Sequence, residues 1–411
     1  MSAEALAWVT VEFMEKVLKK SESDQSIEVK DLHTKNVVGK GDNYGSDMIR
    51  AHVKYLRNKS GSTVMETISV IIKISPIAEG ATKEMLKKFE SFESEINMMQ
   101  TTLAKMNDIL NEKNYRLNAR VLYAEIGDPS FLVLEDLAPL GYRMANRLVG
   151  LDLEHCRLVI KNLAKFHASS VAVSEEDSTS RTFYNKGLFQ ADHPEDWKQF
   201  CVSGMRSLGK ELLNWPELGA NQSRYSEKLL KFSTVCYDKA VKCFNEKRND
   251  FIVLNHGDLW VNNMLFRYDD EGKLIDHIFV DFQQPVWNSP AIDILSFLST
   301  SIADDVDLHH RETLLKEYLN MLTKTMSRLR CKTKPPTMEA LNKSLKDYEL
   351  YAVIASCLFL PVVLLDKSKA VSFNEMMHDD DFINPGYKGQ VYRKIMLRRL
   401  PSWIERGLID D

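Results

Sequence analysis

Residues 251–267 read FIVLNHGDLWVNNMLFR, and residues 277–283 read HIFVDFQ. Short apolar runs surround two polar loops in these stretches, a pattern that predicts three strands with polar side chains at their ends. The turn formers DDEG at 269–272 predict that residues 264–267 and 277–280 pair as an antiparallel hairpin. In such a hairpin the residue before the first strand and the residue after the second, Asn263 and Asp281, lie side by side.

Asn263 and Asp281 supply two hard oxygen ligands, which suit Mg²⁺ because this ion takes few protein oxygens besides waters and phosphates. Asp258 lies five residues before Asn263, close enough to face a hydroxyl presented to a metal-bound phosphate. We therefore expect Asp258 to accept or orient the proton of that hydroxyl. His256, Asp258 and Asn263 form an H-x-D-x-x-x-x-N pattern, which with Asp281 indicates the catalytic and metal loops of a protein-kinase-like fold.

A lysine ends the apolar run of an upstream stretch that we expect to be a strand. Residues 66–74 alternate and then become fully apolar at 70–72, as in a strand buried on both faces, before Lys73. A single lysine in such a place is more often an exposed strand end, since its charge resists burial. Its position ahead of a helix predicted over 83–106 favours pairing of Lys73 with the α- and β-phosphates of ATP.

Two glutamates of the helix predicted over 83–106 are candidates for an ion pair with Lys73. Phe92 and Ile96 mark the buried face of this helix, and Glu95 borders that face. We favour Glu95 as the partner of Lys73, with Glu93 as the open alternative.

The loop at 36–46 is rich in glycine and turn formers and precedes a strand-like stretch at 49–55. Gly41, Gly45 and Ser46 would offer backbone N–H groups and little side-chain bulk to phosphates. The same residues also suit a plain hairpin turn, and the pattern is not G-x-G-x-x-G.

The chain as a whole predicts an α+β fold in two lobes. Its 411 residues, 44% of them hydrophobic, can bury a full core. Strand and helix signals mix up to residue 136, whereas helical patterns dominate beyond it. We expect a smaller N-lobe at 1–136, with the nucleotide-binding antiparallel sheet and helix, and a larger, mainly helical C-lobe at 137–411, with the catalytic loop, the metal loop and the substrate pocket.

Composition excludes several other classes of protein. Lys and Arg total 54 against 58 Asp and Glu, which leaves a net charge of −4 and no basic footprint for nucleic acid. The apolar run at 350–365 is interrupted by Ser356 and Pro361 and falls short of the ~20 residues of a membrane span. With no basic stretch near Glu4 and Glu12 to suggest a signal peptide, we expect a cytoplasmic protein without a membrane span or an obligate protein partner.

Four further residues have a simpler structural interpretation. His167 lies on the apolar face of a helix and is expected to be a hydrogen-bonded core histidine. Trp260 and Trp287 flank the catalytic segments, where we expect them to pack rather than to contact substrate. Asp293 lies among apolar neighbours, so we expect its carboxylate to accept specific hydrogen bonds or to cap a helix.

The chain resembles the insect ecdysteroid kinase-like (CHK kinase-like) family, whose relatives include choline kinases and aminoglycoside phosphotransferases. The segments that carry the resemblance are GDNY at 41–44, LEDL at 134–137, LAKFHA at 163–168, HGDLW at 256–260 and PAIDIL at 290–295. Trp260 and Gln283 are more specific to this family than the generic kinase elements are.

The resemblance implies a bilobal fold with ATP between the lobes. It implies that Lys73 and Glu95 form the ion pair, and that Asp258 is the catalytic aspartate. It also implies that Asn263 and Asp281 bind the metal.

By the same resemblance, Asn43 joins Gly41, Gly45 and Ser46 in the nucleotide-binding loop. The backbone of Glu135 and Leu137 would contact adenine. Asp293 would steady the catalytic loop.

Departures from protein kinases bear on the substrate. Gly257 replaces the arginine of H-R-D, Gln283 replaces the glycine of D-F-G, and no A-P-E segment follows. A peptide acceptor is therefore not expected, and the family name suggests the hydroxyl of a steroid, whereas other members act on xenobiotics. Two alternatives remain open: a choline or aminoglycoside kinase, and a nucleotide-binding scaffold without catalysis.

Overall fold

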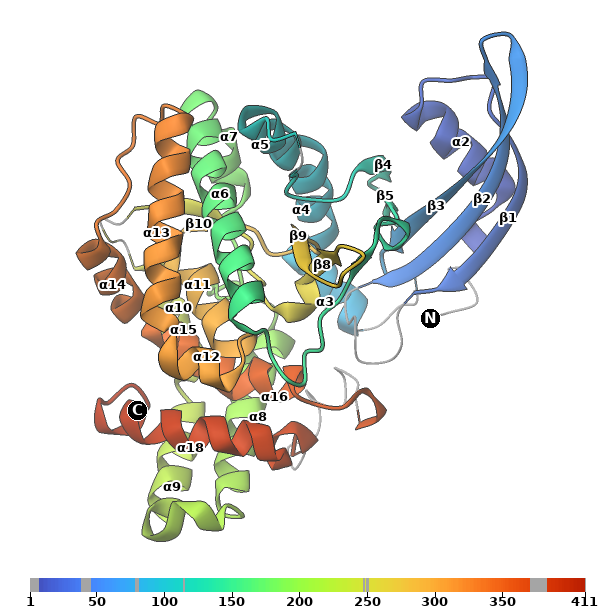
Figure 1. Cartoon of the computed structure of the whole chain (residues 1–411). Helices are drawn as coiled ribbons and strands as arrows, with labels where there is room; N and C mark the ends of the chain where they lie inside the picture. Colours follow the sequence, from blue (N-terminus) through green and yellow to red (C-terminus); the bar gives the residue numbers. More distant parts are fainter. Residues whose placement is uncertain are drawn as a thin grey trace.

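The computed structural model describes residues 7–37, 46–77, 81–113, 115–246, 248, 251–369 and 383–410. Figure 1 shows a twisted sheet with α2 (Val11–Ser21) at one end of the molecule and the helices from α6 onward at the other. We call α2 and the sheet the sheet lobe, and the described residues from 138 on the helical lobe.

The sheet lobe is built on five antiparallel strands in the order β1-β2-β3-β5-β4. The strands are β1 (Glu28–Asn36), β2 (Asp47–Lys59), β3 (Ser62–Ile74), β4 (Val121–Glu125) and β5 (Phe131–Glu135). Alternate apolar residues of β2 and the apolar end of β3 form a core with the buried face of α2, which includes Met14 and Leu18. The strands predicted at 49–55 and 66–74 are thus confirmed, each within a longer strand.

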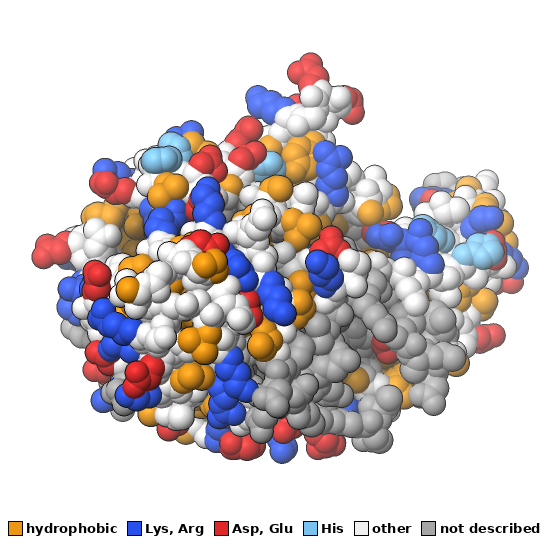
Figure 2. All heavy atoms as spheres, turned by 90° about the horizontal axis from the view of Figure 1, so that it is seen from below, with side chains coloured by type: hydrophobic (Ala, Val, Ile, Leu, Met, Phe, Trp, Pro, Cys, Tyr) orange, Lys and Arg blue, Asp and Glu red, His pale blue; other side chains and the backbone are white. Residues whose placement is uncertain are grey.

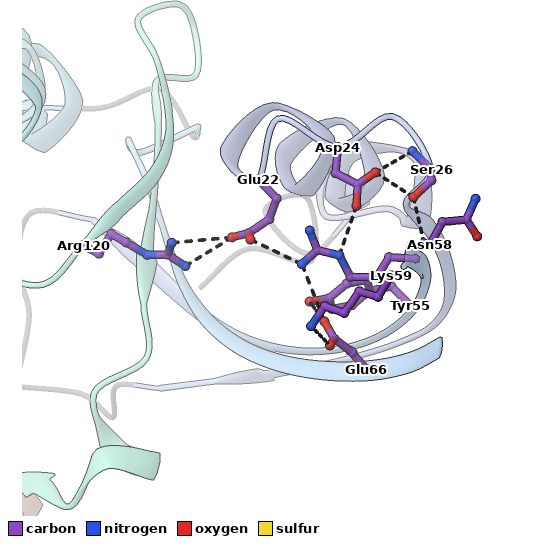
Figure 3. A network of polar contacts seen from close by, with 9 residues as sticks. Glu22, Asp24, Ser26, Tyr55, Asn58, Lys59, Glu66 and Arg120 are labelled. Carbon is purple, nitrogen blue, oxygen red and sulfur yellow. Dashed lines mark hydrogen bonds and ion pairs between the residues drawn. The ribbon is translucent and has the colours of Figure 1, made fainter. Parts of the chain in front are cut away.

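A network of polar side chains ties α2 and the turn after it to this sheet (Figure 3). Arg57 of β2 donates to Asp24 at 3.0 Å and pairs with Glu22 at 3.4 Å, and Glu22 in turn contacts Arg120 ahead of β4. Asp24 also accepts the amide N–H of Ser26 at 2.9 Å. These contacts fix the packing angle of α2 at its C-terminal end.

The helix predicted over 83–106 is wrong as a single element. The structure has α3 (Ala81–Phe89), α4 (Ser91–Asn97), a π-helical turn (Met98–Thr102) and α5 (Leu103–Leu110). Glu90 breaks the helix because its φ of 53° lies in the left-handed region, where residues with a Cβ are strained. We call α3, α4, the π-helical turn and α5 the bridging helices, and Figure 1 shows α5 beside α6.

The helical lobe packs around α11, a helix whose ten residues are all buried. Its helices are α6 (Leu153–Glu176), α7 (Thr179–Phe183), α8 (Glu195–Leu212), α9 (Gln222–Ser233), α10 (Cys236–Asn245), α11 (Ala291–Thr300), α12 (Asp304–His309), α13 (Arg311–Arg328), α14 (Met338–Asp347), α15 (Glu349–Ile354), α16 (Leu360–Val363) and α18 (Gln390–Glu405). The apolar run at 350–365 is a buried helical segment, as expected, with a π-helical turn at Ala355–Phe359 between α15 and α16.

Two small sheets in the helical lobe support the catalytic segments. β6 (Tyr142–Arg143), β8 (Met264–Tyr268) and β9 (Leu274–Phe279) form one, and β7 (Val253–Asn255) pairs with β10 (Val286–Asn288) in the other. β8 and β9 are antiparallel, with Met264 opposite Phe279, so the predicted hairpin is confirmed.

The surface in Figure 2 carries Lys and Arg side chains interspersed with Asp and Glu over the part of this face that is described. None of the helices in the described ranges has the length and apolar character that crossing a membrane requires.

Candidate active site

Lys73, near the end of β3, lies between two carboxylates. Its Nζ donates to Glu95 Oε2 at 2.7 Å and Oε1 at 2.9 Å, and to Asp281 Oδ1 at 2.7 Å. Glu95 is on α4 and is 1% exposed, whereas Glu93 is exposed. Of the two glutamates considered from the sequence, the structure brings Glu95 to Lys73.

The charge of Lys73 is maintained despite its burial. Burial acts to lower the pKa of Lys73, but the negative charges of Asp281 and Glu95 outweigh burial and raise the pKa above its usual value. A permanent cation is thus fixed where β3 meets the loop after β9. A phosphate group is the kind of anion that such a cation binds.

The hairpin of β8 and β9 brings Asn263 and Asp281 to the same end. The amide N–H of Val280 donates to the backbone carbonyl of Asn263 at 3.0 Å, which places Asp281 one residue beyond that bond. Asp281 has a φ of 67°, a left-handed conformation that Asp tolerates better than most residues. Its side chain is 30% exposed and is therefore open to a ligand.

Asp258 is joined directly to Asn263. Asn263 Nδ2 donates to the backbone carbonyl of Asp258 at 2.8 Å and to its Oδ2 at 3.0 Å. Burial and the charge of Asp281 raise the pKa of Asp258 to about 7, against the opposing effect of the hydrogen bonds from Asn263 and Trp260. A carboxyl group with such a pKa can both accept and release a proton near neutral pH.

Residues Asn263 and Asp281 fit a magnesium ion. The side-chain amide nitrogen of Asn263 donates to Asp258, and Oδ1 of Asp281 accepts a hydrogen bond from Lys73. Within the described part of the chain, Asn263 Oδ1 and Asp281 Oδ2 accept no hydrogen bond. Two hard oxygens with room for waters and phosphates match the preference of Mg²⁺. No cluster of three or more His, Cys, Asp or Glu side chains that could hold a metal occurs among the described residues.

The catalytic loop is held by a buried carboxylate on α11. Asp293 accepts the backbone N–H groups of His256 at 2.7 Å and Gly257 at 2.9 Å. Its Oδ2 also lies 3.1 Å from His167 Nε2, and His167 Nδ1 lies 2.8 Å from Tyr318 Oη. Both His167 nitrogens thus have partners, so the core histidine expected from the sequence is confirmed.

The segment between the lobes is anchored through Asp136. Arg50 Nε lies 2.7 Å from Asp136 Oδ2, and Ser69 Oγ donates to the same carboxylate at 2.6 Å. These contacts, with the Ala138 amide, lower the pKa of Asp136 although burial acts to raise it. They fix the backbone from Glu135 to Leu137, the predicted adenine contact.

The backbone N–H and C=O groups of this segment differ in whether they already have a hydrogen-bond partner. The Glu135 N–H donates to the Arg120 carbonyl at 2.9 Å. The Leu137 carbonyl accepts from Leu140 and Tyr142, whereas the Leu137 N–H has no acceptor within the described ranges. The Leu137 N–H is therefore available to donate a hydrogen bond to a ligand.

The predicted phosphate-covering loop lies mostly beyond what the structure describes. Gly41, Asn43 and Gly45 are outside the described residues. Ser46 precedes β2, and the register pairs Met48 with Lys73, so Ser46 lies at the same end of the sheet as Lys73.

Sequence reasoning did not assign a role to two side chains that contact the site. Gln283 Nε2 lies 3.4 Å from Glu95 Oε2, and Tyr351 Oη lies 3.4 Å from the carbonyl of Gly257. In the sequence, Gln283 stood out as a family signature and as the residue in place of the glycine of D-F-G. Tyr351 lies in an apolar run with no local signal. Trp260 and Trp287 pack partly buried against the core.

Comparisons with known proteins bear on this site. A model of the ecdysteroid kinase-like family matches residues 40–331. Among solved structures, a protein of Haemophilus somnus 129PT assigned as a fructosamine-3-kinase is similar at 15% identity and a TM-score of 0.36, over 89% of this chain and 97% of its own. No curated protein matches the chain. The family match covers most of the chain and includes segments of both lobes seen in Figure 1.

Proposed function

The chain belongs to the ecdysteroid kinase-like family, and on this premise we propose that it transfers the γ-phosphate of ATP, with Mg²⁺, to a hydroxyl of a small molecule. At the coarser level it is a small-molecule kinase-like protein, and ATP use is general in such families. The proposed acceptor is an ecdysteroid or a similar hydroxylated lipophile or xenobiotic, a class that the family's name suggests.

The observation that carries this proposal is the meeting of four polar side chains from separate segments. Asp258 is hydrogen bonded to Asn263, and the β8–β9 hairpin sets Asn263 beside the loop of Asp281. Asp281 in turn contacts Lys73. A scaffold without catalysis has no chemical need for this combination.

Asp258 would orient the acceptor hydroxyl and take its proton as the oxygen attacks the γ-phosphorus. Its hydrogen bond to Asn263 at 3.0 Å fixes the direction of one carboxylate oxygen. Asp293 keeps the backbone of the same loop in place through His256 and Gly257.

Lys73 would bind the α- and β-phosphates, with Glu95 holding its ammonium group in place. Asn263 and Asp281 would hold Mg²⁺ through one oxygen each. When bound, Mg²⁺ neutralises phosphate charge and orients the phosphates for in-line attack. Leu137 would donate its backbone N–H to the adenine ring.

The test is phosphate transfer from γ-labelled ATP to a panel of ecdysteroids, plant alcohols, choline and aminoglycosides. Asp258→Asn should lower the rate roughly 100-fold or more, because it removes the proton acceptor. Asp270→Asn is the matched control, since Asp270 is an exposed aspartate in the turn of the same hairpin.

Each result has a defined meaning. Transfer to a steroid hydroxyl that falls in Asp258→Asn and persists in Asp270→Asn supports the proposal. Transfer to choline or aminoglycosides alone would show that the acceptor is a cationic compound of that kind and not a steroid. ATP binding without transfer to any compound, or an undiminished rate in Asp258→Asn, would overturn the mechanism.

A further inference from the structure

The bridging helices do not share the core of the sheet lobe. That core contains buried side chains of α2 and of the five strands, and none of the bridging-helix side chains that the structure describes belongs to it. Ile96, Met99 and Leu103 instead belong to a cluster that includes α6, β7 and α11 and, from the sheet lobe, Leu132 of β5. The helix that carries Glu95 therefore belongs to an apolar cluster that lies mostly in the helical lobe.

Phe89 attaches α3 to a different part of the helical lobe. It ends α3 and is 5% exposed, and every other buried member of its apolar cluster lies between residues 188 and 409. Its ring centroid lies 4.4 Å from that of His193 and 5.7 Å from that of Trp197, with an edge-to-face angle of 88° to the tryptophan. We call His193 and Trp197 the aromatic socket.

The aromatic socket is itself held in place. His193 Nδ1 lies 3.1 Å from Tyr237 Oη, and the Trp197 indole N–H donates to the Leu188 carbonyl at 2.8 Å. Edge-to-face contacts favour one ring orientation over others. Phe89 thus enters a site whose shape is set by α8 and α10.

Polar contacts also attach the start of α4 to the helical lobe. Lys186 pairs with Glu90 at 2.8 Å, and Gln284 Nε2 lies 3.4 Å from Ser91 Oγ. Ser91 begins α4, and Glu95 follows four residues later on the same face of the helix. A seven-residue helix is not stable by itself, so its position depends on such contacts.

From these contacts we propose that Phe89 is a positioning residue of the phosphate-binding site, which acts through Glu95. Its seat in the aromatic socket fixes α4 on the helical lobe, so that Glu95 and Asp281 approach Lys73 from one rigid body. The Lys73–Glu95 pair is then set by packing between the lobes. The inference rests on the proposed function in one respect, namely that Lys73 binds the phosphates of ATP.

Phe89→Ala should weaken binding of Mg·ATP roughly tenfold, because Lys73 loses the carboxylate that orients it. Phe232→Ala is the matched control, since Phe232 on α9 is fully buried in the same cluster and lies 143 residues along the chain from Phe89, on a helix that carries no residue of the proposed site. Calorimetric titration with Mg·ATP measures the affinity. Hydrogen exchange of residues 91–97 in the ligand-free chain measures the anchoring of α4 independently.

A double-mutant cycle separates positioning from general destabilisation. In a Glu95→Gln background, Phe89→Ala should cause little further loss of ATP affinity. Phe89→Leu keeps apolar volume without the ring contacts and should give an intermediate loss, about threefold, which also covers the case that Phe89→Ala does not fold.

Faster exchange of residues 91–97 in the Phe89 variants, absent in Phe232→Ala, supports the inference, as does non-additivity with Glu95→Gln. Equal effects of Phe89→Ala and Phe232→Ala, or additive losses in the cycle, would overturn it. If the wild-type chain binds no ATP, the proposed function fails. Hydrogen exchange of residues 91–97 then becomes the only test of whether Phe89 positions α4. Unchanged exchange in the Phe89 variants would overturn the inference.

Discussion

Gly257 has a φ of 84°, and a Cβ built on it would lie 1.7 Å from the carbonyl oxygen of Gln284. The arginine that protein kinases have at this place of the loop could not be accommodated here. The absence of that arginine, read from the sequence as a sign against a peptide acceptor, therefore also has a steric cause.

Substitution of Gly257 by alanine should disrupt the catalytic loop. We expect Gly257→Ala to abolish phosphate transfer and to lower the free energy of unfolding by several times the ~1–2 kcal/mol that a left-handed residue with a Cβ costs. Gly272→Ala is the control, because Gly272 has a φ of 81° with no atom within 4 Å of its added Cβ. Urea unfolding and the transfer assay measure both effects. Equal losses in the two variants would contradict the steric explanation.

At this scale, the sequence was sufficient where the site residues are close in the chain. Asp258, Asn263 and Asp281 lie on loops joined by one hairpin, so their spacing predicted their proximity. Arg50 and Asp136 are 86 residues apart, and Gly257 and Tyr351 are 94 apart. No local pattern marks such pairs, because each arises only when separate elements pack.

Among the elements, the bridging helices show the limit of periodicity. Phe89, Phe92 and Ile96 have helical spacing on both sides of Glu90, so the apolar pattern continues where the backbone does not. The break becomes necessary only because Phe89 enters the helical lobe while Glu95 faces Lys73. This geometric demand is invisible in a window of sequence.

The C-terminal helix α18 depends on a buried ion cluster with α12. Asp307 lies 3.1 Å from Arg399 and 2.9 Å from Arg311, and the Arg399 side chain is 11% exposed. Burial lowers the pKa of Arg399, and it acts to raise that of Asp307, which the arginines nevertheless hold below its usual value. The buried charges of Asp307 and Arg399 therefore compensate each other.

Asp307→Ala should lower the free energy of unfolding by about 3–5 kcal/mol, because it leaves the Arg399 guanidinium buried without its counter-charge. Asp305→Ala on the same helix is the control, since Asp305 is exposed and should change stability little. Chemical denaturation followed by circular dichroism measures the difference. A loss below about 1 kcal/mol in Asp307→Ala would show that the cluster is not a determinant of stability.

Over the whole molecule, folding buries histidines that must stay neutral. Burial lowers the pKa of His277 to about 3 and that of His193 to about 4. Well above pH ~6.5, the usual pKa of histidine, both residues are neutral in the folded and the unfolded chain. As the pH falls below this value, the unfolded chain binds protons that the folded chain excludes, so stability is lost progressively.

His277→Gln should therefore reduce the dependence of stability on pH. Between pH 6 and 4 the slope of the unfolding free energy should fall by about 1.4 kcal/mol per pH unit relative to wild type. His33→Gln is the control, because the His33 side chain is 73% exposed. Urea titrations at several pH values give the slopes, and identical slopes in His277→Gln and wild type would rule out this proton linkage.

The two-lobed architecture was predictable because strand and helix signals separate along the chain. The strand order β1-β2-β3-β5-β4 was not, since the bridging helices intervene between β3 and β4. Which lobe those helices join was also hidden. In the structure, Ile96, Met99 and Leu103 belong to a cluster that lies mostly in the helical lobe and also includes Leu132 of β5, whereas Glu95 pairs with Lys73 of β3.

The same assignment determines how the chain can be cut in the laboratory. A fragment that stops after Asp136 would carry Phe89, Ile96 and Leu103 without the helices that cover them. Exposed apolar surface of this kind leads to aggregation. A cut before α3 would instead remove β4 and β5 from the sheet, together with Leu122, Phe131 and Val133 of its core. The interiors of the two lobes are therefore interleaved along the chain, and neither cut gives two fragments that each keep a complete core.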